Sequence, residues 1–168
     1  KFGGFSFDGG LAYVDSKLDQ VTLVDTRNLP PAPVRLPQCT PASPPGTCFD
    51  YTSFLGTGGG GPNLFSPKWS YNFGAQYEFE VGSDASLTPR INYAYVGSRW
   101  TNLFYNRQFD YLAGRGLLSA QVTLRYRDWM IEVYATNLAN KKYVSGQSGN
   151  NEFYGSPREF GVRASVKF

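Results

Sequence analysis

The feature that most constrains this chain is the strict alternation of apolar and polar side chains over long runs. Between Trp69 and Val81, every second residue is apolar, and the residues between them are polar or glycine. Alternation with a period of two predicts a β-strand with one apolar face and one polar face. Runs of this kind predict six strands, near residues 3–17, 67–81, 86–99, 116–127, 129–137 and 158–168. We therefore expect an all-β protein.

The length of these runs indicates which kind of β-protein to expect. Most span about 9–13 residues, whereas strands of soluble proteins have about 5–6 and a tilted strand that crosses a bilayer needs about 9–11. The polar positions carry too many charged groups for a dry core, because burying an unpaired charge is costly. They include Asp8, Glu78, Glu80, Arg90, Gln121, Arg125, Glu132 and Arg163. We predict an antiparallel transmembrane β-barrel in which these groups line the interior and pair with one another or with a plug. A soluble sandwich with the same groups in water is the alternative.

Short and long connections alternate along the chain. The links at 82–85 and at Asp128 are short, whereas those near 18–66, 100–115 and 138–157 are long. Outer-membrane barrels have this pattern, with short periplasmic turns and longer external loops. If the short turns are periplasmic, five aromatic residues lie near the periplasmic interface of the membrane, where aromatic side chains form a girdle. The set is Phe5, Phe79, Tyr126, Trp129 and Phe168.

The composition argues against several other classes of protein. The 168 residues include no His, which excludes Ser-His-Asp and Cys-His catalysis and histidine metal sites. The 16 basic and 13 acidic residues are dispersed, and no basic stripe indicates a nucleic-acid partner. The run Gly56–Gly61 matches G-x-G-x-x-G, but it neither follows a strand nor opens a helix, so we expect a flexible loop there. We predict no enzymatic activity, no cofactor and no metal site.

The segment 18–66 differs in composition from the rest of the chain. It contains most of the 11 prolines and both cysteines, Cys39 and Cys48, in the stretch CTPASPPGTC. A cysteine pair in an exported protein predicts a disulfide, here one that closes a proline-rich tip. Two free thiols are the alternative, and a redox role is disfavoured because the spacing is not C-x-x-C.

The segment 100–115 mixes aromatic and charged side chains. Exposed aromatic and arginine residues are favoured at recognition surfaces. The candidate ligand-binding residues are Tyr105, Arg107, Asp110, Tyr111 and Arg115. The alternative is an aromatic girdle with a loop that packs on its neighbours.

Two stretches near the end of the chain resemble the C-terminal strands of TonB-dependent outer-membrane receptors. WMIEVYATNLANKKYVSG contains the pattern N-L-x-[ND]-K-x-Y, and FYGSPREFGVRASVKF contains G-x-P-R-x-[FY]-x-[VL] with a terminal aromatic. The matching residues are Asn137, Leu138, Asn140, Lys141 and Tyr143 in the first stretch, and Gly155, Pro157, Arg158, Phe160, Val162 and Phe168 in the second. The resemblance covers about residues 66–168 well and 1–17 loosely.

The resemblance implies that residues 1–168 are the C-terminal part of a larger barrel, of 22 strands in this family, whose plug domain and TonB box lie outside this chain. Six strands cannot close a barrel, since the smallest have about eight. The implied location is the outer membrane of a Gram-negative bacterium, with lipid and lipopolysaccharide around it. The implied partners are the TonB complex, reached through the plug, and the barrel assembly machinery, which reads the terminal strand and Phe168.

The function implied by the resemblance is energy-coupled uptake of a scarce small molecule, most often an iron–siderophore complex. A complete small barrel of about eight strands with a structural or adhesion role is the runner-up. It would need two further strands, for instance at Val21–Val24 and Phe49–Phe54, in a segment whose prolines disfavour them. An outer-membrane hydrolase is a third alternative, disfavoured by the absence of His.

Overall fold

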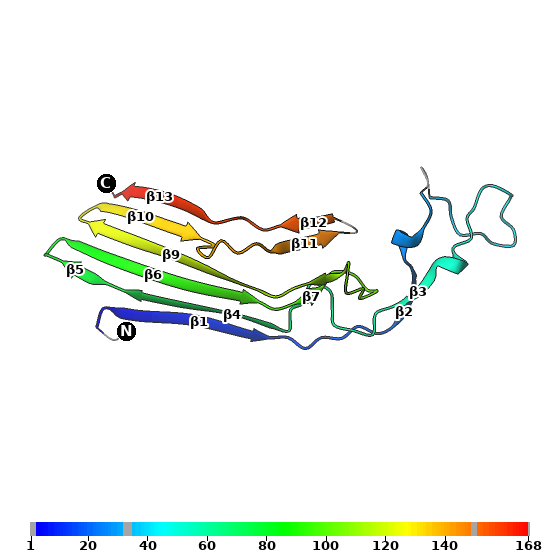
Figure 1. Cartoon of the computed structure of the whole chain (residues 1–168), viewed down its shortest axis with the longest axis horizontal. Coiled ribbons are helices and arrows are strands. Elements are labelled where there is room, and N and C mark those ends of the chain that lie inside the picture. Colours follow the sequence, from blue (N-terminus) through cyan, green and yellow to red (C-terminus); the bar gives the residue numbers. More distant parts are fainter. Residues whose placement is uncertain (1–2, 32–34, 149–150, 168) are drawn as a thin grey trace.

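A seven-stranded antiparallel sheet forms the body of the molecule in the computed structural model, which describes residues 3–31, 35–148 and 151–167 (Figure 1). Neighbours along the chain are neighbours in the sheet, in the order β1-β4-β6-β9-β10-β13, and β5 pairs with β6. The strands are β1 (Phe5–Tyr13), β4 (Trp69–Tyr77), β5 (Phe79–Val81), β6 (Ala85–Val96), β9 (Arg115–Tyr126), β10 (Trp129–Thr136) and β13 (Glu159–Val166). The expectation of an all-β, antiparallel protein is confirmed.

Each range expected to form a strand contains a strand of this sheet, with one interruption. The run 67–81 divides into β4 and β5 at Glu78, whose backbone N–H donates to the carbonyl of Gly4 at 2.8 Å. The neighbouring β6 pairs with β4 as far as Arg90 and with β5 from Leu87. Pro89 lies between these two pairings. Since proline has no N–H for the hydrogen-bond ladder, it accounts for a break at this point.

The two faces of the sheet have opposite chemistry because directly paired residues on neighbouring strands share a face. Gln76 pairs with Arg90, Arg90 with Gln121 and Gln121 with Tyr134, so the polar positions form continuous rows. Ala75, Ile91 and Ala120 form a matching apolar row one residue away. The alternation in the sequence therefore persists across the whole sheet.

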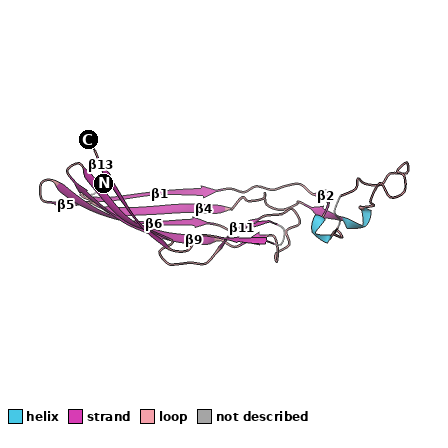
Figure 2. Cartoon of the chain, turned by 90° about the horizontal axis from the view of Figure 1, so that it is seen from above, coloured by secondary structure: helices cyan, strands magenta, loops and turns pink. Residues whose placement is uncertain are grey.

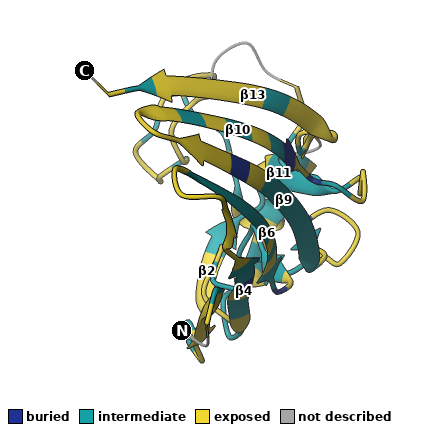
Figure 3. Cartoon of the chain, turned by 90° about the vertical axis from the view of Figure 1, so that its left-hand side faces the viewer, coloured by how far each residue is buried: buried dark blue, intermediate teal, exposed yellow. Residues whose placement is uncertain are grey.

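The apolar face is the exposed one. Exposed residues, yellow in Figure 3, are frequent along β10 and β13. Phe7 and Leu11 on β1 are each 67% exposed, and Phe160 and Val162 on β13 are 69% and 71% exposed. On the polar face, by contrast, the Glu132 side chain is 13% exposed and Thr123 is buried. Leu112 and Ala135 are the buried hydrophobic residues of the described part of the chain. This distribution is the reverse of that in a water-soluble domain, where large contiguous apolar patches are covered.

The two ends of the sheet differ in the length of their connections (Figures 1 and 2). One end carries the short turns together with the beginning of β1 and the end of β13. The aromatic residues Phe5, Phe79, Tyr126 and Trp129 lie at this end, and all four are exposed. These four residues share one end of the sheet, as predicted, whereas their place in an aromatic girdle stays a prediction. Phe168 lies outside the described residues.

The other end carries the long segments, which contain short paired strands rather than loops alone. The pairs are β2 (Val21–Val24) with β3 (Leu55–Gly58), β7 (Arg99–Trp100) with β8 (Tyr111–Leu112), and β11 (Val144–Ser148) with β12 (Asn151–Tyr154). Two 3-10 turns, Thr26–Asn28 and Thr52–Phe54, lie in the first segment. Among the described residues, no helix is long and apolar enough to cross a membrane.

The segment 18–66 differs at two places from the complete-barrel alternative and at a third from the expected glycine loop. A strand forms at Val21–Val24, but it pairs with Leu55–Gly58 in a separate two-stranded sheet and adds nothing to the main sheet. Phe49–Phe54 contains a 3-10 turn in place of the strand that a complete small barrel would require. The glycine run 56–61, expected to be a flexible loop throughout, supplies the end of β3, because the pairing with β2 orders its first three residues.

The predicted disulfide between Cys39 and Cys48 is present, with the two Cα atoms 4.9 Å apart. It closes a tip that projects away from the sheet beyond β2 and β3 (Figure 2). The base of the tip is held by backbone hydrogen bonds from Phe49 N to Pro37 O (2.9 Å) and from Cys39 N to Phe49 O (3.2 Å). The tip is thus ordered by its own contacts, as expected for a small crosslinked loop.

Candidate ligand-binding site

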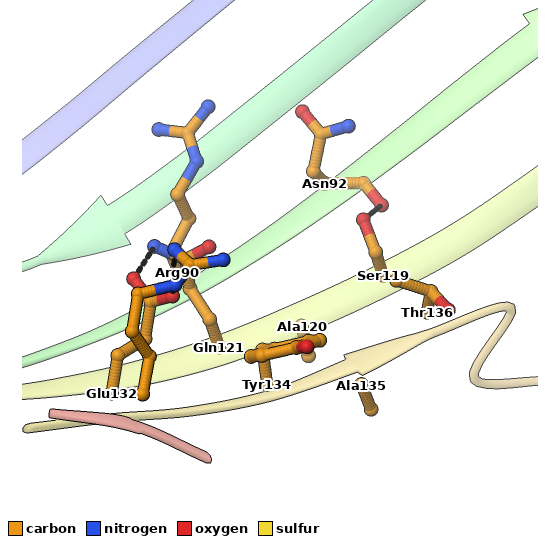
Figure 4. A pocket seen from close by; sticks show the side chains of 10 residues that line it. Arg90, Asn92, Ser119, Ala120, Gln121, Glu132, Tyr134, Ala135 and Thr136 are labelled. Carbon is orange, nitrogen blue, oxygen red and sulfur yellow. Dashed lines mark hydrogen bonds and ion pairs between the residues drawn. The ribbon is translucent and has the colours of Figure 1, made fainter. Parts of the chain in front are cut away.

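The polar face of the sheet carries a belt of charged and amide side chains that satisfy one another. Arg90 on β6 donates to Asp8 on β1 (2.7 Å) and to Gln76 on β4 (3.0 Å). Glu132 on β10 accepts from Arg163 on β13 at 3.0 Å. It also accepts from Gln121 on β9 at 3.2 Å, and Figure 4 shows these two side chains from close by. The expectation that these groups pair with one another is confirmed for these residues.

A hollow of about 260 Å³ lies over this belt, between β6, β9, β10 and β13. Its charged groups, Arg90, Glu132 and Arg163, are all engaged in ion pairs. Paired charges of this kind hold the side chains of the hollow in a fixed geometry. In the described part of the chain, no group of three or more Cys, Asp or Glu side chains is placed to hold a metal ion.

The end of the sheet with the long segments is built on a corner around Asn137. This buried residue has φ 44° and follows the last residue of β10. Its side-chain N–H groups donate to the carbonyls of Lys141 (2.9 Å) and Ser156 (3.1 Å), and its side-chain oxygen accepts from Lys141 N (2.9 Å). Asparagine tolerates the left-handed conformation, and its amide can bridge two strands of chain. Asn137 therefore ties the beginning of the segment 138–157 to its end.

Asn140 completes the same corner. Its side-chain oxygen accepts from Arg158 N at 3.1 Å, just before β13 begins. Gly155 N donates to Tyr143 O at 2.9 Å, and the Tyr143 ring fills the space that a side chain on Gly155 would need. Some of the residues that carry the resemblance thus form one local structure that aims β13 back along β10. They are Asn137, Asn140, Lys141, Tyr143, Gly155 and Arg158.

A cavity of about 350 Å³ opens beside this corner, between β8, the beginning of β9, and the β11-β12 pair. Aromatic and basic side chains dominate its lining: Tyr111, Arg115, Lys141, Lys142, Tyr143 and Tyr154. Glu152 supplies the one acidic side chain of the lining and accepts a hydrogen bond from the Tyr154 hydroxyl at 3.0 Å. The cavity is therefore net positive and has flat aromatic walls.

Arg115 links this cavity to the polar face of the sheet. It pairs with Val96 in the register that also pairs Gln121 with Arg90, so it lies on the same face as the charged belt. Its guanidinium lies over the Tyr143 ring, 4.8 Å from the ring centre. Arg99 on β7 lies nearby and donates from Nη2 to the carbonyl of Ser145 at 3.1 Å. Burial lowers the pKa of Arg99, and the positive charge of Arg115 lowers it further.

The structure separates the five predicted ligand-binding residues. Tyr111 and Arg115 line the cavity, and Arg107 lies over the Tyr111 ring at 5.0 Å. The Tyr105 hydroxyl donates to the carbonyl of Pro62 at 2.8 Å, so it joins two long segments. Asp110 is buried and accepts from Arg27 at 2.6 Å. The contacts of Tyr105 and Asp110 hold the long segments together. For these two residues the structure therefore favours the alternative of a loop that packs on its neighbours.

Arg27 is the link between the projecting segment and the segment 100–115. Besides Asp110, it donates from Nη2 to Asp25 at 2.9 Å and lies over the Phe104 ring at 5.8 Å. The hydrogen bond from Arg27 holds the pKa of the Asp25 carboxyl below its ordinary value. A backbone hydrogen bond from Gly59 N to Leu103 O (2.8 Å) strengthens the same connection. These two long segments consequently form one packed unit.

Reasoning from sequence missed Arg99, Lys142 and Tyr154 as parts of the site. Lys142 and Tyr143 stood in the stretch ANKKYVSG, where the adjacent basic and aromatic residues were a readable signal. Tyr154 and Arg99 gave no such signal, because the β11-β12 and β7-β8 pairs bring them to the cavity region from separate segments.

These features describe an open, curved antiparallel sheet of the kind that forms part of a β-barrel wall. Over 68% of its length, the chain is similar to the crystal structure of the ferric-catecholate import receptor Fiu of E. coli K12 in its closed form, with a TM-score of 0.54 and 19% sequence identity. The match spans 17% of the length of that receptor. At this level of identity the similarity shows the fold alone. No family model matches the sequence, and no curated protein matches it.

Proposed function

We propose that this chain forms part of the barrel of an outer-membrane receptor of the TonB-dependent class. The observation that carries the proposal is the two-faced sheet, with an exposed apolar face and a polar face whose charged groups pair with one another, on a fold shared with part of the receptor Fiu. An apolar face of this size is stable against lipid and costly against water. The polar face would line the interior of the barrel.

The open edges of the sheet support a larger barrel. Among the described residues, β1 and β13 each pair on one side only. Unpaired strand edges are not tolerated in lipid, because their N–H and C=O groups find no water. The remaining strands would come from the rest of a longer chain, which would also carry the plug domain through which TonB acts. The terminal strand, with Phe168, would address the barrel assembly machinery.

The proposed activity is uptake of a scarce solute, with an iron–siderophore complex as the leading candidate. Fiu is described as a ferric-catecholate import receptor, and the net positive, aromatic cavity of this chain is compatible with an anionic aromatic chelate. The long segments would face the outside and lipopolysaccharide, and the short turns the periplasm. Neither a cofactor nor an enzymatic activity is part of the proposal.

The experiment that tests this function uses the complete gene containing this chain, in a Gram-negative host that lacks its own iron–siderophore receptors. We expect the protein in the outer membrane and uptake of radioactive ferric siderophore that stops when TonB is deleted. The panel of solutes should include catecholate and hydroxamate chelates, a vitamin and an oligosaccharide. Uptake unaffected by loss of TonB, or absence of the protein from the outer membrane, would contradict the proposal.

A further inference from the structure

The apolar face of the sheet has a hollow of about 330 Å³ over β4, β6 and β9. Ala75 and Ala120 lie on either side of Ile91 in one row of paired residues, and Pro89 lies next to this row. Larger side chains line the hollow around them: Phe5, Tyr77, Ile91 and Val122, each between 39% and 48% exposed. The small residues therefore leave a depression in a face that carries large apolar side chains.

The hollow suits an apolar chain. Gln76, Arg90 and Gln121 also line it, but their side chains are hydrogen-bonded on the polar face, to one another and to Glu132. Among the described residues, β4, β6 and β9 pair on both sides, so a polypeptide finds no strand edge to extend there. The volume is at the lower end of the about 300–1,000 Å³ of ligand pockets, which fits a stretch of an acyl chain.

The same face leads from the hollow to the end of the sheet with the short turns. Val122, Leu124 and Tyr126 follow one another on this face of β9, and all three are exposed. Four residues of an antiparallel strand span about 14 Å, and the hydrocarbon of one membrane leaflet is about 15 Å thick. An acyl chain that reaches the hollow would therefore have its head group at the level of Tyr126.

A cation and an anion lie at that level. The Arg127 guanidinium is 5.2 Å from the centre of the Tyr126 ring, and its Nη2 is 3.4 Å from an Asp84 carboxylate oxygen. Both side chains are exposed, so both can also contact groups outside the protein. Arginine binds phosphate through charge-assisted hydrogen bonds, and a carboxylate accepts them from an ammonium group. The pair therefore complements a head group that carries both charges, as phosphoethanolamine does.

We propose that the hollow binds an acyl chain of a zwitterionic phospholipid in the periplasmic leaflet, with the phosphate at Arg127 and the ammonium group at Asp84. This site rests on the proposed function, which places the short turns on the periplasmic side. That leaflet consists of phospholipid, whereas lipopolysaccharide lies in the outer one. Ala75 and Ala120 make room for the acyl chain, and Tyr126 lies between the chain and its head group.

The test is native mass spectrometry of the purified complete protein, stripped of lipid in detergent and titrated with phosphatidylethanolamine. We expect Ala120→Leu to weaken binding about tenfold, because the larger side chain takes the place of about two methylene groups of the acyl chain. Ala75→Leu enters the same hollow from β4 and should have the same effect. Arg127→Gln should weaken binding of phosphatidylethanolamine about threefold and leave binding of diacylglycerol, which has no charged head group, unchanged.

Ala164→Leu is the matched control. It makes the same substitution at an exposed alanine on the same face, on β13 and outside the hollow, and affinity should be unchanged. The heat-dependent shift in electrophoretic mobility selects the folded variants for comparison. Equal affinity of Ala75→Leu, Ala120→Leu and Ala164→Leu would overturn the site, and so would tighter binding of lipid A than of phosphatidylethanolamine. TonB-dependent uptake alongside such a result would leave the receptor function intact, so the two failures can be told apart.

Discussion

Individual side chains at the corner after β10 decide how the last strand is aimed. Asn137 bridges Lys141 and Ser156, and Asn140 accepts from Arg158, so two amide groups organise both ends of the same segment. Both residues have positive φ, at 44° and 50°. The corner requires a residue with positive φ and a side chain that both donates and accepts hydrogen bonds. Asparagine suits it, because it adopts this conformation readily and its amide offers a donor and an acceptor. The corner explains in physical terms why these residue types occur at this spacing.

Asn137→Ala should destabilise the protein by about 1–3 kcal/mol, because it removes the three hydrogen bonds that the buried Asn137 side chain makes to Lys141 and Ser156. Denaturation of the refolded complete protein in urea, followed by tryptophan fluorescence, measures the change. Asn92→Ala, at an ordinary position within β6, is the comparison and should have a smaller effect. Equal effects of the two substitutions would rule out a special role for the corner.

Whole strands are fitted together, on both faces of the sheet, by aromatic side chains that cover glycines. The Tyr134 ring on β10 occupies the space beside Gly161 on β13, and the Tyr93 hydroxyl does the same beside Gly116 on β9. A glycine in a strand weakens it unless a neighbouring ring covers the gap. These pairs therefore set the register of β10 against β13 and of β6 against β9.

Gly161→Ala should cost about 1–3 kcal/mol, because the added methyl group overlaps the Tyr134 ring and the ring must leave its position. Gly146→Ala is the matched control, since a methyl group there meets only the Phe153 ring at 3.9 Å. Urea denaturation again provides the measurement. If the ring is the cause, combining Gly161→Ala with Tyr134→Ala should cost less than the sum of the two changes. Strict additivity would show that the two residues do not interact.

The molecule as a whole presents an extended apolar surface to its surroundings and keeps its ion pairs on the other side. Val122 and Gln121 illustrate the division, because they are neighbours on β9 but face opposite ways. Val122 is 41% exposed on the apolar face, whereas Gln121 donates to Glu132 on the polar face. One position of sequence thus separates a surface suited to lipid from one suited to water.

Val122→Lys should lower the stability of the membrane-inserted protein by about 2–4 kcal/mol, the usual cost of a lysine on the lipid face near the middle of the bilayer. Gln121→Lys adds the same side chain one residue earlier, next to Glu132, and should cost little. Folding into lipid vesicles, followed by the heat-dependent shift in electrophoretic mobility, compares the two variants. Similar stability of both variants would contradict a lipid-facing position for Val122.

Much of the fold was readable from the sequence because its main signal is local. Alternation along 69–81 or 115–126 reports the two faces of a strand directly, and short links such as Asp128 force neighbouring strands to pair in antiparallel order. Cys39 and Cys48 were equally readable, since only nine positions separate them. By contrast, β2 pairs with β3 across a long stretch of chain, and although Val21–Val24 was considered as a strand, its partner at Leu55–Gly58 was not predicted. The short pairing of β7 with β8 was not predicted either.

The candidate site, unlike the fold, was only partly predictable from the sequence. Residue types in 100–115 suggested recognition, but composition does not distinguish Asp110, which is buried against Arg27, from Arg115, which lines the cavity. The distinction depends on segments far apart in the sequence that fold against one another, and such contacts have no periodic signature. Strand order, the chemistry of the two faces and the disulfide therefore follow from the sequence. The cavity and the loop contacts exist only once the long segments have packed together.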